Sequence, residues 1–201
     1  MNFFKDTDVR PLLLVPVLGL VAWPLVGASW STWLTLTVAG LAMGMIIFVM
    51  ASGLTLVFGL MDVLNFGHGL FIALGAFVAT TVLGGMSAWT ESADWGANLI
   101  AVLMAMVVAM AVAAAVGLAF ERFIVRPVYG QHLKQILITM GGMIIGEELI
   151  KVVWGPQQIA LPMPEALRGA LLWGDAAIEK YRLSAVGVGL VMMAAQLWVL
   201  S

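Results

Sequence analysis

Residues Ala97–Phe120 read ANLIAVLMAMVVAMAVAAAVGLAF, a stretch without a single charged side chain. A helix that crosses a bilayer needs about 20 predominantly apolar residues, because the hydrocarbon core is about 30 Å thick. A helix on the surface of a soluble domain would instead carry a polar face. This stretch therefore predicts a membrane-spanning helix.

The composition of the whole chain supports a membrane protein. Of its 201 residues, 63% are hydrophobic and 10% are charged, whereas soluble domains carry about 25% charged residues. A soluble fold of this size could not cover so much apolar surface, which excludes a soluble domain or a secreted enzyme. The net charge of −2 and the lack of a basic patch favour no nucleic-acid partner. The chain has no cysteine, which excludes disulfides, thiolate catalysis and cysteine metal sites.

The charged residues gather in a few short groups, and apolar segments of bilayer-spanning length lie between them. The pattern predicts an all-α fold, a polytopic transmembrane bundle of about six spans that forms a single domain over residues 1–201. The predicted spans are Leu12–Ala28, Leu34–Leu60, Leu70–Gly85, Ala97–Phe120, Gln135–Val153 and Leu183–Leu200.

The first of these segments could be mistaken for a signal peptide, because Lys5 and Arg10 precede it and small residues end it. Pro16 and Pro24 interrupt it, however, and further spans follow, so a retained helix is favoured.

Lysine and arginine counts predict that the N-terminus is cytoplasmic, since cytoplasmic loops are enriched in these residues. In this orientation the inner loops hold Lys5, Arg10, Arg122, Arg126 and Lys134. The loop that contains Glu91 and Asp94 then faces outward, as does the segment from Trp154 to Arg182. Two pairs of glycines at GxxxG spacing, Gly40–Gly44 and Gly142–Gly146, predict close helix contacts.

Residues 52–69, SGLTLVFGLMDVLNFGHG, place polar side chains and glycines at the end of an apolar run. In lipid such groups are tolerated where they face protein or a water-filled cavity. One interpretation is a broken helix that lines a translocation pathway or its gate, with Thr55, Asp62, Asn65 and His68 as candidates. The other is a tight turn in which Asn65 caps the next helix. One histidine and one aspartate do not make a metal shell, so no metal site is expected.

Residues 147–151, EELIK, close another apolar run. Glu147 and Lys151 are spaced to pair on one helix face. Glu148 would then face elsewhere, and it is a further candidate for the pathway or gate. The alternative is an interfacial ion pair at the outer end of the helix.

Residues 120–128, FERFIVRPV, form a short basic loop, either a plain cytoplasmic loop or a contact for a cytoplasmic partner through Arg122, Arg126 and Pro127. No H-E-x-x-H, G-x-S-x-G or P-loop motif occurs, so no catalytic residues and no cofactor are predicted. Any energy for transport must then come from a partner or an ion gradient.

The stretch from Gly53 to Gly69 resembles the signature of the branched-chain amino acid ABC transporter permeases, G-x-T-x-x-x-G-x-x-x-x-x-N-F-A-H-G. The matching residues are Gly53, Thr55, Gly59, Asn65, Phe66, His68 and Gly69, with Gly67 in place of the usual alanine.

Two further stretches resemble the same family. Glu121-Arg122 with Arg126-Pro127-Val128 is similar to its E-R…R-P-[LV] loop. Residues 139–162 are similar to the helix and outer loop that follow. Three motifs in the right order over about residues 40–165 make the resemblance specific.

The resemblance implies a permease subunit of an ABC importer in a prokaryotic inner membrane. The implied partners are a second, related permease, two cytoplasmic ATPase subunits and an extracytoplasmic solute-binding protein. The implied solutes are branched-chain or other amino acids, or alternatively urea and short amides. Family members are usually longer, so the chain is expected to correspond to their N-terminal two-thirds: a fragment, a split gene or a short subunit. An ion-gradient-driven transporter or channel and a purely structural subunit are the competing hypotheses.

Overall fold

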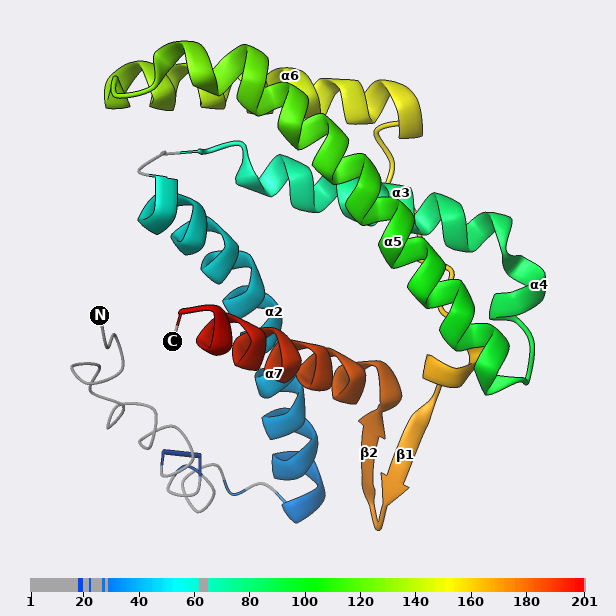
Figure 1. The fold of residues 1–201 in the computed structure, drawn as a ribbon. Coiled ribbons are helices and arrows are strands. Elements are labelled where there is room, and N and C mark those ends of the chain that lie inside the picture. Colours follow the sequence, from blue (N-terminus) through cyan, green and yellow to red (C-terminus); the bar gives the residue numbers. More distant parts are fainter. Residues whose placement is uncertain (1–17, 20–21, 23–26, 28, 62–64, 201) are drawn as a thin grey trace. The chain divides into compact units, whose positions relative to one another are not determined.

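The computed structural model describes residues 18–19, 22, 27, 29–61 and 65–200 (Figure 1). The predicted span Leu12–Ala28 lies largely outside the described residues, and so does the candidate Asp62. Most of the described chain is helical.

The long helices coincide with the predicted spans that follow the first. The helices are α2 (Trp30–Met61), α3 (His68–Gly85), α4 (Ser87–Thr90), α5 (Trp95–Phe120), α6 (His132–Trp154) and α7 (Lys180–Leu200). Except for the short α4, each begins and ends within about four residues of a predicted span, inside the usual uncertainty of helix boundaries. The prediction of a mostly helical chain is confirmed.

Three of the described helical segments are long and apolar enough to cross a membrane, namely Trp30–Leu60, His68–Gly85 and Trp95–Val128. Helices α6 and α7 contain 23 and 21 residues, or about 34 and 31 Å at 1.5 Å per residue. The count of about six spans and the cytoplasmic N-terminus therefore stay predictions.

A short β-hairpin shows that the all-α prediction is wrong for residues 170–179. Strand β1 (Ala170–Trp173) pairs antiparallel with β2 (Ala176–Glu179), and Trp173 lies opposite Ala176. Gly174 adopts a φ of +60° at the reversal, a conformation that favours glycine. Strands of four residues are too short to show a periodic hydrophobic pattern, which is why the sequence did not reveal them.

The chain divides into two compact units, residues 1–49 with 167–201 and residues 50–166. Helix α2 contributes to both units. In the second unit, α3 packs along α5 through small residues on α5. Ala101 and Ala105 are 0% and 2% exposed and form a cluster with Leu83 of α3. Alanines one turn apart allow the two helices to approach closely.

Helix α6 contacts the beginning of α3 through one face, which carries the buried residues Gln135, Thr139 and Ile150. Gly142 and Gly146 lie on the same face. A Cβ placed on Gly146 would be 2.3 Å from Cδ2 of Leu70 in α3. Gly146 thus marks a close helix contact, as its GxxxG spacing predicted.

In the first unit, α7 packs against α2 at Gly189. A Cβ placed on Gly189 would lie 2.6 Å from Cβ of Met45. Gly40 and Gly44, in contrast, have no such neighbour within 4 Å among the described residues. The close contact of this part of α2 therefore lies at Met45, the residue next to Gly44, and not at the two glycines themselves.

The substitution Gly189→Ala tests the α2–α7 contact. Cβ of Met45 is fixed by its backbone, so the added methyl must push the helices apart, and overpacking of this kind costs about 1–3 kcal/mol. Gly187→Ala is the matched control, because its methyl would enter open space. We expect a lower thermal unfolding midpoint in detergent for Gly189→Ala alone. Equal midpoints for the two variants would contradict the contact.

Candidate functional site

The turn before α3 is shaped by the Asn65 side chain. Oδ1 of Asn65 accepts a hydrogen bond from the backbone N–H of Gly67 at 2.9 Å. The backbone N–H of His68 donates to the carbonyl of Asn65 at 3.3 Å. Gly67 is the N-cap residue of α3 and offers no side-chain cap. For residues 65–68 the structure thus shows a local turn, with Asn65 bonding just before the helix begins.

Helix α6 holds this turn through a buried hydroxyl. The backbone N–H of Phe66 donates to Oγ1 of Thr139 at 3.3 Å. Thr139 is fully buried, and its hydroxyl donates to the carbonyl of Gln135 at 2.7 Å. Gln135 is only 1% exposed, and its Oε1 has no hydrogen-bond partner in the described part of the chain. Polar groups are thus concentrated where α6 meets the turn.

The imidazole of His68 lies against the backbone of α2 at Gly53. A Cβ on Gly53 would be 3.0 Å from both Cε1 and Nε2 of the ring, so any larger residue would crowd the histidine. The structure therefore brings together two residues of the sequence signature that are separated by the end of α2 and the turn.

Phe120 covers the turn from the end of α5. A Cβ on Gly67 would lie 3.3 Å from Cζ of Phe120, and one on Gly142 would lie 2.6 Å from Cε2. The Phe120 ring also makes an edge contact with Phe71, with centroids 5.3 Å apart. The turn, α5 and α6 consequently meet at one aromatic ring.

Two of the predicted pathway residues make their hydrogen bonds within their own helices. Thr55 is exposed on α2 and donates to the carbonyl of Ala51 at 2.9 Å. Glu148 is exposed on α6 and accepts a hydrogen bond from Nζ of Lys151 at 2.6 Å. The expected Glu147–Lys151 pair is therefore replaced by a pair at i,i+3. Glu148 lies about 13 Å along α6 from Thr139 at 1.5 Å per residue.

The basic loop begins with a change in helix type. A π-helical turn, Glu121–Val125, continues α5, and a 3-10 turn, Arg126–Val128, follows it. Arg122, Arg126 and Pro127 are exposed. The three predicted partner-contact residues are thus presented together on the surface of this loop.

A hydrogen bond between side chains closes the loop. The hydroxyl of Tyr129 donates to Oε1 of Glu121 at 2.6 Å. This hydrogen bond is the main reason why the pKa of Tyr129 is raised. Burial and the negative charge of Glu121 raise this pKa further, whereas the positive charge of Arg126 lowers it.

Comparison with known families identifies the chain. Residues 36–200 match the family model described as "Branched-chain amino acid transport system / permease component", well over half of the chain. The chain belongs to this permease family. The match confirms the resemblance found in the sequence. The family is one of membrane transport components, not of enzymes. No curated protein and no solved structure matched in the corresponding comparisons.

Asn98 lies at the opposite end of the second unit of the permease, near the beginning of α5. It was not among the residues singled out from the sequence. Its amide nitrogen donates to the carbonyls of Trp89, Ser92 and Asp94 at 3.3, 2.7 and 2.9 Å. Its Oδ1 accepts from the N–H of Ala166 at 3.1 Å. Asn98 is 2% exposed and joins the loop before α5 to the segment after α6. The available signal was a single amide near the beginning of the uncharged run Ala97–Phe120.

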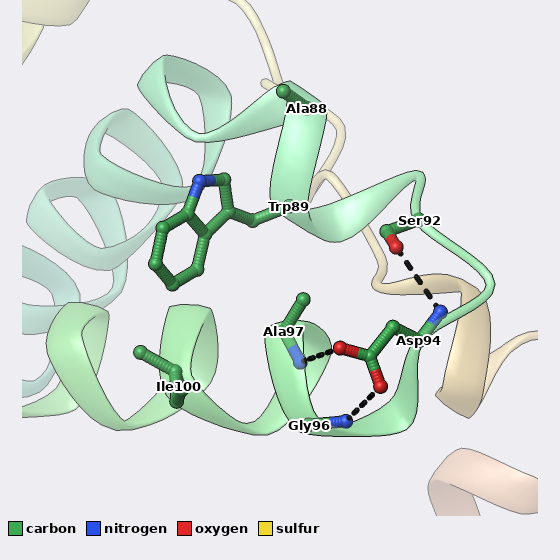
Figure 2. A pocket seen from close by; sticks show the side chains of 7 residues that line it. All are labelled: Ala88, Trp89, Ser92, Asp94, Gly96, Ala97 and Ile100. Atoms are coloured by element: carbon green, nitrogen blue, oxygen red, sulfur yellow. Dashed lines mark hydrogen bonds between the residues drawn. The ribbon is translucent and has the colours of Figure 1, made fainter.

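A surface pocket of about 400 Å³ lies beside the residues that Asn98 bonds before α5 (Figure 2). Trp89 and Ile100 line it, and Asp94 caps α5 by accepting from the N–H groups of Gly96 and Ala97 at 3.0 and 3.3 Å. Because the Asp94 carboxylate already occupies the helix N-terminus, the pocket is poorly suited to an anion. Among the described residues, no group of three or more His, Cys, Asp or Glu could hold a metal ion.

Replacing Thr139 by valine tests how α6 holds the turn. The isosteric change removes the acceptor for the Phe66 amide. One such bond contributes about 0.5–1.5 kcal/mol, so we expect this amide to exchange roughly two- to tenfold faster. Thr80→Val is the control, because the Thr80 hydroxyl bonds the carbonyl of Ala76 in its own helix. Unchanged exchange at Phe66 by hydrogen-exchange mass spectrometry would contradict the assigned bond.

The Tyr129–Glu121 bond predicts a specific titration. The chain has two tyrosines, so Tyr181→Phe leaves Tyr129 as the sole signal in an ultraviolet titration. A raised pKa means that the bond is complete at neutral pH and is lost as the pH rises through the pKa of Tyr129, above about pH 10. We expect Glu121→Gln to lower this pKa and Arg126→Gln to raise it further. Shifts in the same direction for both variants would refute the assigned contacts.

Proposed function

We propose that the permease is the membrane-spanning subunit of an ABC importer for branched-chain or other amino acids. In this proposal it works in a prokaryotic inner membrane with a second permease subunit, two cytoplasmic ATPases and an extracytoplasmic solute-binding protein. The solute crosses by alternating access, driven by ATP binding and hydrolysis in the partner subunits. The family match over residues 36–200 carries this proposal.

The Asn65–Gly69 turn, which here includes the first two residues of α3, is the proposed pathway or gate element. Asn65 and His68 are both half-buried, so their side chains are held by protein yet remain partly accessible. Together with the buried Gln135 and Thr139, they concentrate polar groups where three apolar helices meet. In a membrane protein the burial of polar groups costs free energy, and such groups commonly mark solute or ion pathways. An amide and an imidazole can also bond the ammonium and carboxylate groups of an amino acid.

The exposed loop from Glu121 to Gln131 is the proposed contact for a cytoplasmic partner. It lies at the same end of the second unit as the Asn65–Gly69 turn, because Phe120 touches both the turn and the π-helical turn. Arg122 and Arg126 would offer cationic hydrogen-bond donors to acidic groups of an ATPase. With a cytoplasmic N-terminus, this end of the unit faces the cytoplasm.

Joint replacement of Asn65 and His68 by alanine tests the pathway assignment. In proteoliposomes that hold the permease with its ATPases and binding protein, we expect ATP-driven uptake to fall by roughly tenfold or more. His132→Ala is the matched control, since His132 is the other histidine of the chain and is exposed at the start of α6. Undiminished uptake by the double variant would remove these residues from the pathway.

The same vesicles test the importer itself. ATP-dependent uptake that survives a protonophore supports it. Uptake that persists without the ATPases and collapses with the ion gradient would identify a secondary transporter instead. Testing amino acids against urea and short amides distinguishes the proposed solutes from the alternative class.

A further inference from the structure

Phe120 lies at the boundary between the membrane helix α5 and the exposed loop. It is the last residue of α5, is 8% exposed, and packs with Val125, Ile124 and Phe71. Its neighbours in the π-helical turn differ sharply, since Phe123 is 74% exposed and Arg122 is also exposed. The turn thus has a buried side toward Phe120 and a free side toward solvent or a partner.

Besides these side chains, the ring of Phe120 lies against the backbone of two glycines. On one side it meets Gly67, in the turn that Asn65 shapes, and on the other it meets Gly142 of α6. A Cβ on Gly142 would lie 2.6 and 2.8 Å from Cε2 and Cζ of the ring. Because neither glycine has a side chain that could rotate away, movement of the ring must displace the backbone of the turn or of α6.

The π-helical turn Glu121–Val125 is the segment most able to move this ring. A π-helical turn has an i→i+5 hydrogen-bonding pattern and commonly occurs at functional positions. Here it joins α5 to the 3-10 turn that contains Pro127, so the loop is attached to the membrane helix through a locally altered register. A displacement of the exposed loop therefore reaches Phe120 before any other buried part of α5.

We propose that Phe120 is a positioning residue, which transmits movement of the partner-contact loop to the Asn65–Gly69 turn and to α6. The inference rests on the proposed function, because the movement originates in an ATPase bound to the loop. Phe120 itself does not touch solute. It sets the position of the turn, and through the turn the positions of Asn65 and His68.

The absence of cysteine from the chain allows a direct test. Gly69→Cys places a reporter on the turn, at an exposed position where an added Cβ meets nothing within 4 Å. In the reconstituted complex, its maleimide labelling rate is measured without nucleotide and after trapping with ATP and vanadate. We expect the two rates to differ several-fold, and the difference to vanish with Phe120→Ala although vanadate still traps the ATPase. Leu118→Ala is the control and keeps the difference, because Leu118 is exposed on α5 outside the partner-contact loop.

A compensating pair separates transmission from loss of folding. Gly142→Ala forces a methyl group into the Phe120 ring, so it should reduce the uptake obtained per ATP hydrolysed. Phe120→Leu provides space for that methyl, and the Gly142→Ala/Phe120→Leu variant should recover coupling above the level of Gly142→Ala alone. Additive losses in the double variant would overturn the inference, as would a nucleotide-dependent labelling difference that persists in Phe120→Ala.

The failure of the inference is distinguishable from the failure of the proposed function. If the complex without substitutions at Phe120 or Gly142 shows no ATP-driven uptake, the importer proposal is overturned, and the inference with it. If this complex transports and Phe120→Ala transports with equal coupling and equal reporter response, only the inference is overturned.

Discussion

Hydrocarbon offers no hydrogen-bond partners, so a membrane-embedded chain must satisfy its own backbone groups. The long helices α2, α3 and α5 do this between their end turns. The departures from regular helix matter for the same reason. At the turn before α3 the freed amides of Phe66 and Gly67 bond to the side chains of Thr139 and Asn65. Each of these side chains therefore supplies the acceptor that a backbone carbonyl would supply inside a helix. Helix α6 supplies one of these acceptors, and Asn65 supplies the other from within the turn.

Close packing in this protein relies on small residues rather than on a large apolar core. Ala101 and Ala105 let α5 approach α3, and Gly146 and Gly189 admit the side chains of Leu70 and Met45. Lipid tails are as apolar as leucine, so helices in a bilayer gain little from burying apolar surface against each other. Association of the helices therefore depends on contact area and on close approach of their backbones. The many exposed leucine, methionine and valine side chains on the same helices are what a lipid-facing surface requires.

The two ends of the second unit are joined in different ways. At one end a single asparagine, Asn98, bonds three carbonyls from residues 89–94 and the amide of Ala166. At the other end an aromatic ring, Phe120, lies between glycines. Four hydrogen bonds at one residue favour a fixed geometry. A ring against bare backbone has no directional bonds, which suits the end where transport would require movement.

Helix positions and family membership could be predicted from the sequence, because uncharged runs such as Ala97–Phe120 and the spaced residues from Gly53 to Gly69 are local patterns. The hairpin at 170–179, the Lys151–Glu148 pair and the roles of Asn98 and Phe120 could not. A four-residue strand has no readable period, and a lysine next to two glutamates has two possible partners. Asn98 and Phe120 look ordinary in the sequence. Only the tertiary structure brings Ala166 to one of them and Gly67 and Gly142 to the other, because those contacts join segments far apart in the chain.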